Sequence, residues 1–253
     1  MPSYTACEVP DVIAGGGNAM VEKTDALLVR KAIRIILHGH ETCATQQAKE
    51  INMKLYYSPG ACSLASHIAL REIGVDPVLV KVSTQTHKTE DGDDFYEINA
   101  KGYVPVLELF DGERLTEGTA VMQYIADRAP EKKLAPPNGS FARYRLQEWL
   151  GYINSELHKA FSPLFVPTTT DPEKDAIRAR IGSRLDWVQT QLGSHPFLMG
   201  EVFTVADGYL FVILSWTRYT GMDLGKWPVL ASYVERIAAR PAVQAALKAE
   251  GLA

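Results

Sequence analysis

The sequence has 253 residues, of which 46% are hydrophobic and 22% are charged, a balance typical of soluble globular proteins. This composition excludes disorder along most of the length and supplies apolar surface for one large core or two smaller ones. Lysine and arginine total 26 against 30 aspartates and glutamates, so the net charge is −4. Because no basic excess exists to neutralise phosphates, we do not expect a nucleic-acid partner.

The cysteines and the apolar runs indicate where the protein works. Cys7, Cys43 and Cys62 are too few and too scattered for a disulfide framework, which favours the reducing cytoplasm. The longest apolar run, residues 209–216, is far shorter than the roughly 20 residues that span a membrane. The first residues contain no basic cluster, so we do not expect a secretory signal. We therefore expect a cytoplasmic protein without membrane contact.

Residues 1–52 differ from the rest, with one amphipathic stretch at 21–37 and no strand alternation. Lys49 to Met53 can be encoded with AAGGAG shortly before an AUG, which resembles a bacterial ribosome-binding site. One hypothesis is therefore that this extension is not physiological and that Met53 is the start. His38, His40 and Cys43 lack a fourth ligand at metal-site spacing, so no metal is predicted there.

Residues 53–133 alternate strand and helix patterns in the order β-α-β-α-β-β-α. The elements are expected at residues 54–57, 63–73, 77–82, 94–99, 104–110, 113–115 and 117–128. This order is that of a thioredoxin-like domain, in which the peptide bond before Pro105 would be cis.

Residues 130–139 are dense in proline and glycine and are predicted to be a linker. Residues 140–253 read as an all-helical domain. Apolar residues recur every three or four positions at Leu146, Trp149, Leu150, Ile153, Leu157 and Phe161, as on one buried helix face. Further helices are expected from Pro172 to about residue 192, after a capping box at Thr204–Asp207, and from Pro228 and Pro241. The fold class is thus an α/β domain followed by an all-α domain.

Cys62 is the first candidate functional residue, because it lies between the first strand and the first helix. The N–H groups and the dipole at a helix start favour a thiolate. The alternative is a small buried hydrophobe. No second cysteine is close in sequence, so any disulfide at Cys62 must form with an external thiol.

Two further groups of residues suggest a binding site. Glu117 and Gly118 open a helix, where the carboxylate would bind an ammonium and the Gly118 N–H a carboxylate. In the helical domain, Gly151, Asn154, Ser155 and His158 fall at helical spacing beside the apolar stripe and would leave a polar strip facing Cys62. An incidental interface face is the alternative for that strip.

Several segments together resemble the bacterial beta class of glutathione S-transferases. They are YYSPGACSLASHI at 56–68, YVPVL at 103–107, LTEG at 115–118, ELHK at 156–159 and FTVAD at 203–207. The resemblance covers residues 53–253. It implies a thioredoxin-like glutathione-binding domain at 53–133, a helical domain at 140–253, and a homodimer.

The resemblance also implies a role for each matching residue. Cys62 and His158 would be the catalytic residues, with Cys62 facing the glutathione sulfur. The Val104 backbone would pair with the cysteinyl part of glutathione, while Glu117 and Gly118 would hold the γ-glutamyl end. The remaining lining would come from Ala61, His87, Pro105, Ser155, Glu156 and Leu157.

Two positions depart from the pattern of the family. His87, with Lys88 beside it, stands where relatives often carry a basic residue for the glycyl carboxylate. Gly151 stands where many relatives have an asparagine that reaches the glutathione of the partner subunit. Glycine has no side chain to make that contact.

The leading interpretation is an enzyme that conjugates glutathione, as co-substrate and without a metal, to small apolar electrophiles. One alternative is a glutathione-dependent thiol–disulfide reductase or peroxidase that uses Cys62. Another is a non-catalytic protein that binds glutathione or apolar ligands. Replacement of Cys62 separates the first two, because redox turnover should vanish while conjugation survives.

Overall fold

The computed structural model describes residues 53–253, and three predictions lie outside that part of the chain. They are the amphipathic stretch at 21–37, the prediction that His38, His40 and Cys43 hold no metal, and the hypothesis that the extension before Met53 is not physiological. Within residues 53–253, no helix combines the length and the apolarity needed to cross a bilayer.

The first domain is built on a four-stranded mixed sheet with the order β2-β1-β3-β4. Its strands are β1 (Lys54–Tyr57), β2 (Val78–Lys81), β3 (Val106–Glu108) and β4 (Arg114–Thr116). β1 runs parallel to β2 and antiparallel to β3, while β3 and β4 form a hairpin. The thioredoxin-like fold class is therefore confirmed.

The alternation of side chains along β1 divides the core between the two faces of this sheet. Leu55 and Tyr57 pack in the main core, whereas Tyr56 packs with Phe95 and Val106 in a second, smaller cluster. The helices of this domain are α2 (Ser63–Glu72) and α3 (Gly118–Arg128), and Phe95 belongs to the 3-10 turn η1 (Phe95–Glu97). The predicted helix at 94–99 is thus a single turn.

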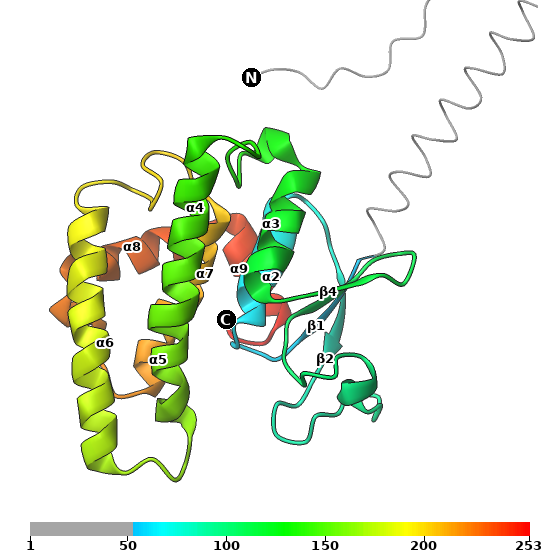
Figure 1. Ribbon diagram of the computed structural model, residues 1–253, viewed down its shortest axis with the longest axis horizontal. Coiled ribbons are helices and arrows are strands. Elements are labelled where there is room, and N and C mark those ends of the chain that lie inside the picture. Colours follow the sequence, from blue (N-terminus) through cyan, green and yellow to red (C-terminus); the bar gives the residue numbers. More distant parts are fainter. Residues whose placement is uncertain (1–52) are drawn as a thin grey trace, which may run out of the picture. The chain divides into compact units, whose positions relative to one another are not determined.

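The second domain is entirely helical, as predicted (Figure 1). Its helices are α4 (Phe141–Tyr152), α5 (Lys159–Phe161), α6 (Asp171–Leu192), α7 (Val205–Ser215), α8 (Pro228–Ala238) and α9 (Pro241–Ala249), with short 3-10 turns η4 (Ser162–Phe165), η5 (Trp216–Tyr219) and η6 (Leu224–Lys226). Helix α7 packs against α2 of the first domain and against α4 and α8 of its own domain.

The start of α7 confirms the predicted capping box. The hydroxyl of Thr204 donates to Oδ2 of Asp207, which also accepts from the Thr204 N–H. The second carboxylate oxygen, Oδ1, accepts from the Leu198 N–H and the Tyr233 hydroxyl. These four donors satisfy a carboxylate whose pKa burial alone pushes upward.

The long apolar stripe does not form one uninterrupted α-helix. Between α4 and α5 the chain winds as a π-helical segment, η3 (Ile153–His158). Ile153 and Leu157 are still buried in the core, so the prediction of the buried face is confirmed. A π turn widens the helix locally, and such segments concentrate at functional sites.

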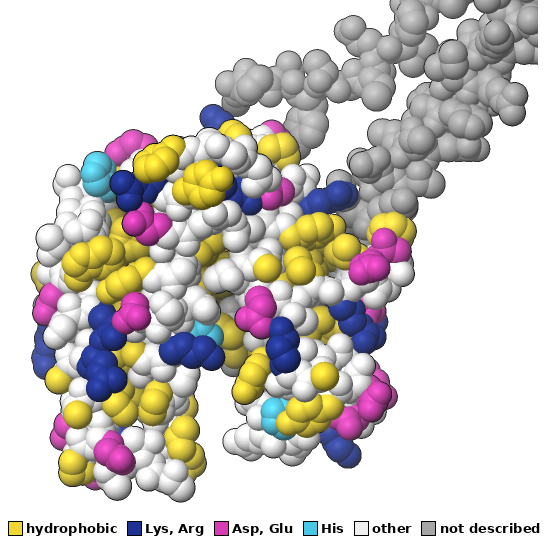
Figure 2. Space-filling view, in the orientation of Figure 1, with side chains coloured by type: hydrophobic (Ala, Val, Ile, Leu, Met, Phe, Trp, Pro, Cys, Tyr) yellow, Lys and Arg dark blue, Asp and Glu magenta, His cyan; other side chains and the backbone are white. Residues whose placement is uncertain are grey.

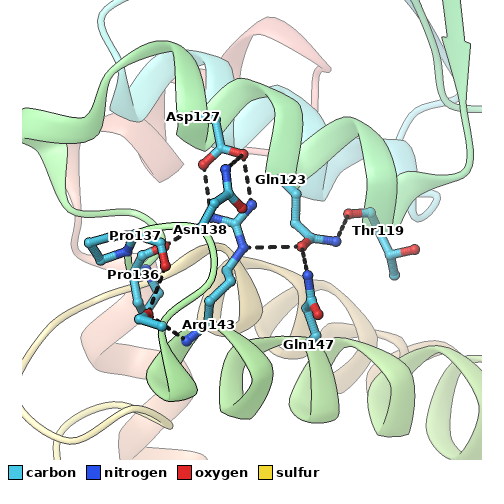
Figure 3. A network of polar contacts seen from close by, with 9 residues as sticks. Thr119, Gln123, Asp127, Pro136, Pro137, Asn138, Arg143 and Gln147 are labelled. Carbon is cyan, nitrogen blue, oxygen red and sulfur yellow. Dashed lines mark hydrogen bonds and ion pairs between the residues drawn. The ribbon is translucent and has the colours of Figure 1, made fainter.

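A buried arginine ties α3 to α4 across the proline-rich linker (Figure 3). The Arg143 guanidinium donates to both carboxylate oxygens of Asp127, at 2.8 and 2.7 Å, and to the carbonyl oxygen of Pro136. Arg143 also donates to Gln123, which accepts a second hydrogen bond from Gln147. A bidentate pair of this kind fixes orientation as well as distance, so the network holds the two domains in register.

Candidate active site

A cavity of about 240 Å³ lies where the two domains meet. Its lining from the first domain includes Cys62, Lys101, Val104, Pro105, Glu117 and Gly118. Its lining from the second domain consists of Asn154, His158, Lys159, Ser162 and Tyr209. Figure 2 shows this face hollowed between the helical elements and the sheet elements, with charged side chains and a histidine at the inner end of the hollow.

Cys62 occupies the N-cap position of α2, as the strand–turn–helix pattern predicted. Its thiol donates a hydrogen bond to the carbonyl oxygen of Val104 across 3.4 Å. Burial raises the thiol pKa to about 11, although the N–H groups of Cys62 and Ser63 act in the opposite direction. The helix start thus favours the thiolate, as expected, but burial outweighs it and keeps the thiol protonated at neutral pH.

The Val104–Pro105 peptide bond is cis, which confirms that prediction. Strand β3 begins at the next residue, Val106, so Val104 and Pro105 form the rim of the sheet at the cavity. The backbone of Val104 is thus placed where an extended peptide could pair with it.

Glu117 precedes α3 with a left-handed φ of +67°, a conformation that costs a non-glycine residue about 1–3 kcal/mol. Its carboxylate accepts a hydrogen bond from the Lys101 ammonium at 2.5 Å, and that ammonium also donates to the Thr116 hydroxyl. Both side chains of this ion pair are substantially exposed, so the pair is weak and an incoming ammonium group can compete for the carboxylate.

The helical domain contributes a polar chain of three residues. Nδ1 of His158 lies 2.7 Å from the Tyr209 hydroxyl, which donates to Oδ1 of Asn154 at 3.1 Å. Burial lowers the pKa of His158 to about 4 and raises that of Tyr209 well above its usual range. At neutral pH, His158 is an uncharged imidazole and Tyr209 a protonated phenol.

Five of the residues that the resemblance assigned to the glutathione site lie outside the lining of this cavity. The Ser155 hydroxyl donates to the Gly151 carbonyl, Glu156 pairs with Arg184 on α6 at 2.6 Å, and Leu157 is fully buried. His87 contacts the Gly102 carbonyl and stacks on Tyr96 with ring centroids 4.7 Å apart. Ala61 precedes Cys62 in the turn before α2.

Tyr209, Lys101 and Lys159 line the cavity but were not predicted from the sequence. Tyr209 lies in an apolar run whose pattern predicts only buried core residues, and its hydroxyl is the one feature that distinguishes it from its neighbours. Lys101 precedes the cis proline by four positions, within a segment that the sequence presents as a loop. The only feature of the sequence that could have indicated Lys159 as a site residue is its position directly after His158.

An aromatic group lies beside His158. Trp216 packs edge-on against His158, Phe161 and Phe165, with ring centroids 5.0, 6.0 and 5.6 Å apart. The Trp216 indole N–H donates to the carbonyl of Gly60, in the turn that carries Cys62. Phe165 is about half exposed, while Phe161 is fully buried. Phe165 therefore offers apolar surface that a ligand can reach.

Within residues 53–253, no group of three or more histidine, cysteine, aspartate or glutamate side chains is placed to hold a metal ion. The chemistry on offer is a carboxylate for a cation, helix N–H groups for an anion, an exposed peptide edge, a thiol and a neutral imidazole. An amino-acid-like or short peptide ligand fits that combination.

Comparisons with known proteins agree with this geometry. Two family models match: the N-terminal domain of glutathione S-transferase at residues 60–128 and its C-terminal domain at residues 171–236. "Glutathione S-transferase GstA" from Escherichia coli O157:H7 is 48% identical over 200 residues, which cover 79% of this chain and all of that protein.

Two solved structures are similar over the same share of the chain, 79%, and over all of their own. One is a sphingomonad glutathione S-transferase complexed with glutathione, with a TM-score of 0.76 and 50% identity. The other is the bacterial beta-class glutathione S-transferase of Sphingomonas chungbukensis, with a TM-score of 0.77 and 49% identity. The fold, the site and the relatives agree that the chain belongs to the glutathione S-transferase family and is similar to the members of its bacterial beta class.

Proposed function

We propose that the protein is a glutathione transferase that binds glutathione in this cavity and conjugates it to small apolar electrophiles. The observation that carries the proposal is the arrangement of Glu117, the Val104 backbone edge and Cys62 around one cavity. A ligand that spans these groups needs an ammonium, an extended peptide and a thiol. Glutathione has all three in that order.

Each part of glutathione has a proposed partner. The γ-glutamyl ammonium replaces the Lys101 ammonium on Glu117, and the adjacent carboxylate takes the Gly118 N–H at the start of α3. The cysteinyl part pairs with the Val104 backbone beside Pro105. At the glycyl end, His87 is the proposed contact. No direct contact with glutathione is proposed for Ala61, Ser155, Glu156 and Leu157, because they lie outside the lining of the cavity.

The proposed electrophile site is the exposed surface of Phe165, which packs on the buried Trp216 beside His158. An apolar electrophile bound there lies next to the imidazole and near the proposed thiol position. The enzyme contributes by positioning the two reactants and by favouring the glutathione thiolate.

A redox function is the second candidate, and a specific observation favours it: the Cys62 thiol lines the cavity. In that cycle the Cys62 thiolate attacks the glutathione sulfur of a mixed disulfide between glutathione and a substrate thiol, so that a Cys62–glutathione disulfide forms and the substrate leaves as a thiolate. The thiolate of a second glutathione then attacks the glutathione sulfur of that disulfide, which releases Cys62 and forms oxidised glutathione. The raised pKa of Cys62 opposes the attacking step. Conjugation is therefore the better supported function.

The family also supports a homodimer in the cytoplasm that takes part in detoxification. The scarcity of cysteines is consistent with a reducing compartment. Gly151 is exposed and has no side chain, so a contact to the glutathione of the partner subunit through this position is absent from the proposal.

The test compares Glu117→Gln with Glu113→Gln, a matched change at an exposed position of the neighbouring hairpin. Loss of a charge-assisted contact to the ammonium should weaken glutathione binding by about tenfold or more in Glu117→Gln. Glu113→Gln should bind like the wild type. Calorimetry measures the glutathione affinity of the two variants, and an assay with a small apolar electrophile measures their conjugation rate. Equal affinity in the two variants contradicts the proposal.

A second measurement separates conjugation, redox chemistry and plain binding. The full chain with Cys7→Ser and Cys43→Ser, which leaves Cys62 as its single cysteine, is incubated with oxidised glutathione, with a Cys62→Ala version as control. A rapid glutathionyl adduct on the first protein alone, seen by intact mass, supports the redox function. Binding of glutathione without turnover of electrophiles, peroxides or disulfides indicates a non-catalytic protein.

A further inference from the structure

The two ring nitrogens of His158 have different surroundings. Nδ1 lies 2.7 Å from the Tyr209 hydroxyl. Nε2 has no hydrogen-bond partner among residues 53–253, and the ring lines the cavity. A neutral imidazole carries one proton, and the partner of one nitrogen decides what the other presents.

The Tyr209 hydroxyl can donate only one hydrogen bond, and the acceptor of that bond determines which ring nitrogen of His158 carries the proton. That proton goes to Oδ1 of Asn154, 3.1 Å away. The bond to His158 must then run the other way, from Nδ1–H to the phenol oxygen. Nε2 is left without a proton and presents its lone pair to the cavity.

The burial of Tyr209 keeps its hydroxyl protonated, so the hydrogen bonds continue to run from His158 to Tyr209 and from Tyr209 to Asn154. Tyr209 is only 3% exposed on α7, so the phenol stays protonated over the working pH range. Asn154 and His158 project from the π-helical segment η3 four positions apart and reach the same hydroxyl. The chain therefore joins two elements that pack against each other.

We propose that Tyr209 and Asn154 are positioning residues that hold His158 with Nε2 as proton acceptor for the thiol of bound glutathione. This inference rests on the proposed function. The S–H bond breaks, its proton forms an N–H bond at Nε2, and the electron pair stays on sulfur as the thiolate. The imidazolium then donates from both nitrogens, with Nδ1–H directed to Tyr209.

The charges around His158 are compatible with this step. Lys159, the first residue of α5, follows it directly and disfavours the imidazolium; Lys101, from the loop before β3, is held by Glu117. Glu117 at the start of α3 and the Cys62 thiol at the start of α2 also line the cavity. The pKa of His158 is about 4 without an anion beside it. A thiolate formed next to the ring supplies that anion and favours the imidazolium.

The central test is the full-length Tyr209→Phe variant, which removes the hydroxyl and keeps the ring. The readout is the ultraviolet absorbance of the thiolate of bound glutathione as a function of pH. We expect the titration midpoint to rise by about one pH unit, a roughly tenfold loss of thiolate, with glutathione affinity within about twofold. A midpoint equal to that of the wild type overturns the inference.

Two further variants distinguish positioning from stability. Tyr233→Phe removes another buried hydroxyl, bonded to Asp207, and should lower the melting temperature without moving the midpoint. Asn154→Asp retains an acceptor for the Tyr209 proton and should keep a low midpoint, whereas Asn154→Leu should raise it. If Asn154→Asp behaves like Asn154→Leu, the amide donates rather than accepts, and the inference fails.

A measurement on the wild type keeps the test independent of variant folding. Nitrogen chemical shifts of His158 report which ring nitrogen is protonated; Nδ1–H is expected, and a majority of Nε2–H overturns the inference. If glutathione does not bind, or its bound thiol titrates as it does free in solution, the proposed function fails instead. A lowered midpoint that is equal in wild type and Tyr209→Phe refutes only the inference.

Discussion

The thiol of Cys62 donates its hydrogen bond to the carbonyl oxygen of Val104, 3.4 Å away. The two residues come from different elements, the start of α2 and the approach to β3. The hydrogen bond requires the protonated form of the sulfur, and burial favours that form as well. A position at the start of a helix is thus not sufficient to make the Cys62 thiol reactive.

The reactivity of Cys62 should follow its raised pKa. In the Cys7→Ser, Cys43→Ser protein, alkylation by iodoacetamide should speed up about tenfold per pH unit and show no plateau below about pH 10. The reason is that only the thiolate reacts, and the thiol pKa is about 11. The pH dependence of the rate, with free cysteine as reference, tests this. A plateau near the ordinary cysteine pKa of about 8.5 would show that the helix start prevails.

His158 should make the protein less stable in mild acid. Its pKa is about 4 in the folded protein and about 6.5 in the unfolded chain. Between these values the unfolded chain binds a proton that the folded protein does not, so the free energy of unfolding falls as pH falls. The difference amounts to at most about 3 kcal/mol.

The matched comparison for this prediction is His158→Gln, which cannot titrate. Urea denaturation of both proteins from neutral pH down to about pH 4 isolates the contribution of His158. The wild type should lose more stability than the variant across this window. Parallel curves would mean that His158 titrates normally in the folded protein.

Arg143 should contribute more to stability than an exposed arginine on the same helix. The Arg143 side chain is 4% exposed, but its partner Asp127 is 38% exposed, so water partly screens the pair. Arg143→Met should lower the free energy of unfolding by about 2 kcal/mol, through lost charge-assisted hydrogen bonds. Thermal and urea unfolding measure the loss.

Arg145→Met is the control, because Arg145 pairs with Glu148 at an exposed position of α4. Its effect should stay within about 0.5 kcal/mol of the wild type. A result in which both variants lose the same stability would show that Figure 3 depicts a network without special energetic weight.

Local patterns were sufficient to predict the elements that surround the site. Strand β1, helix α2 and the cap at Thr204 follow from alternation, glycine placement and capping chemistry, which operate over a few neighbouring residues. Strand β3 is shorter than predicted, three residues against seven, because Pro105 has no N–H to donate to the sheet and the chain turns at Gly112.

Contacts between distant segments were not predictable in the same way. Nothing in the sequence pairs Tyr209 with Asn154, or Glu250 with Gly60. The first contact depends on how α7 packs against η3, and the second on how the last helix packs against the first domain. The thiol pKa of Cys62 could not be obtained from the sequence for a related reason. Burial is a property of the assembled fold, while the helix start is visible in the sequence.

Glu250 should be a long-range support of the turn that carries Cys62. One of its carboxylate oxygens accepts from the Gly60 N–H at 3.0 Å, and the other lies 2.9 Å from Nδ1 of His67. Arg71 donates to the other ring nitrogen of His67, so Nδ1 carries the proton and donates to Glu250. Both side chains of the Glu250–His67 pair are fully buried.

Glu250→Gln keeps the size of the side chain but replaces one acceptor oxygen with an amide NH₂ that faces a donor. We expect a loss of about 2–3 kcal/mol in the free energy of unfolding, the cost of an unsatisfied buried group. The KM for glutathione should rise as well, because the turn at Gly60 leads directly into Cys62. Glu235→Gln, on the exposed face of α8, should change neither quantity. Urea denaturation and steady-state kinetics of the two variants decide the matter: if Glu250→Gln is as stable as Glu235→Gln, the carboxylate does not support the turn.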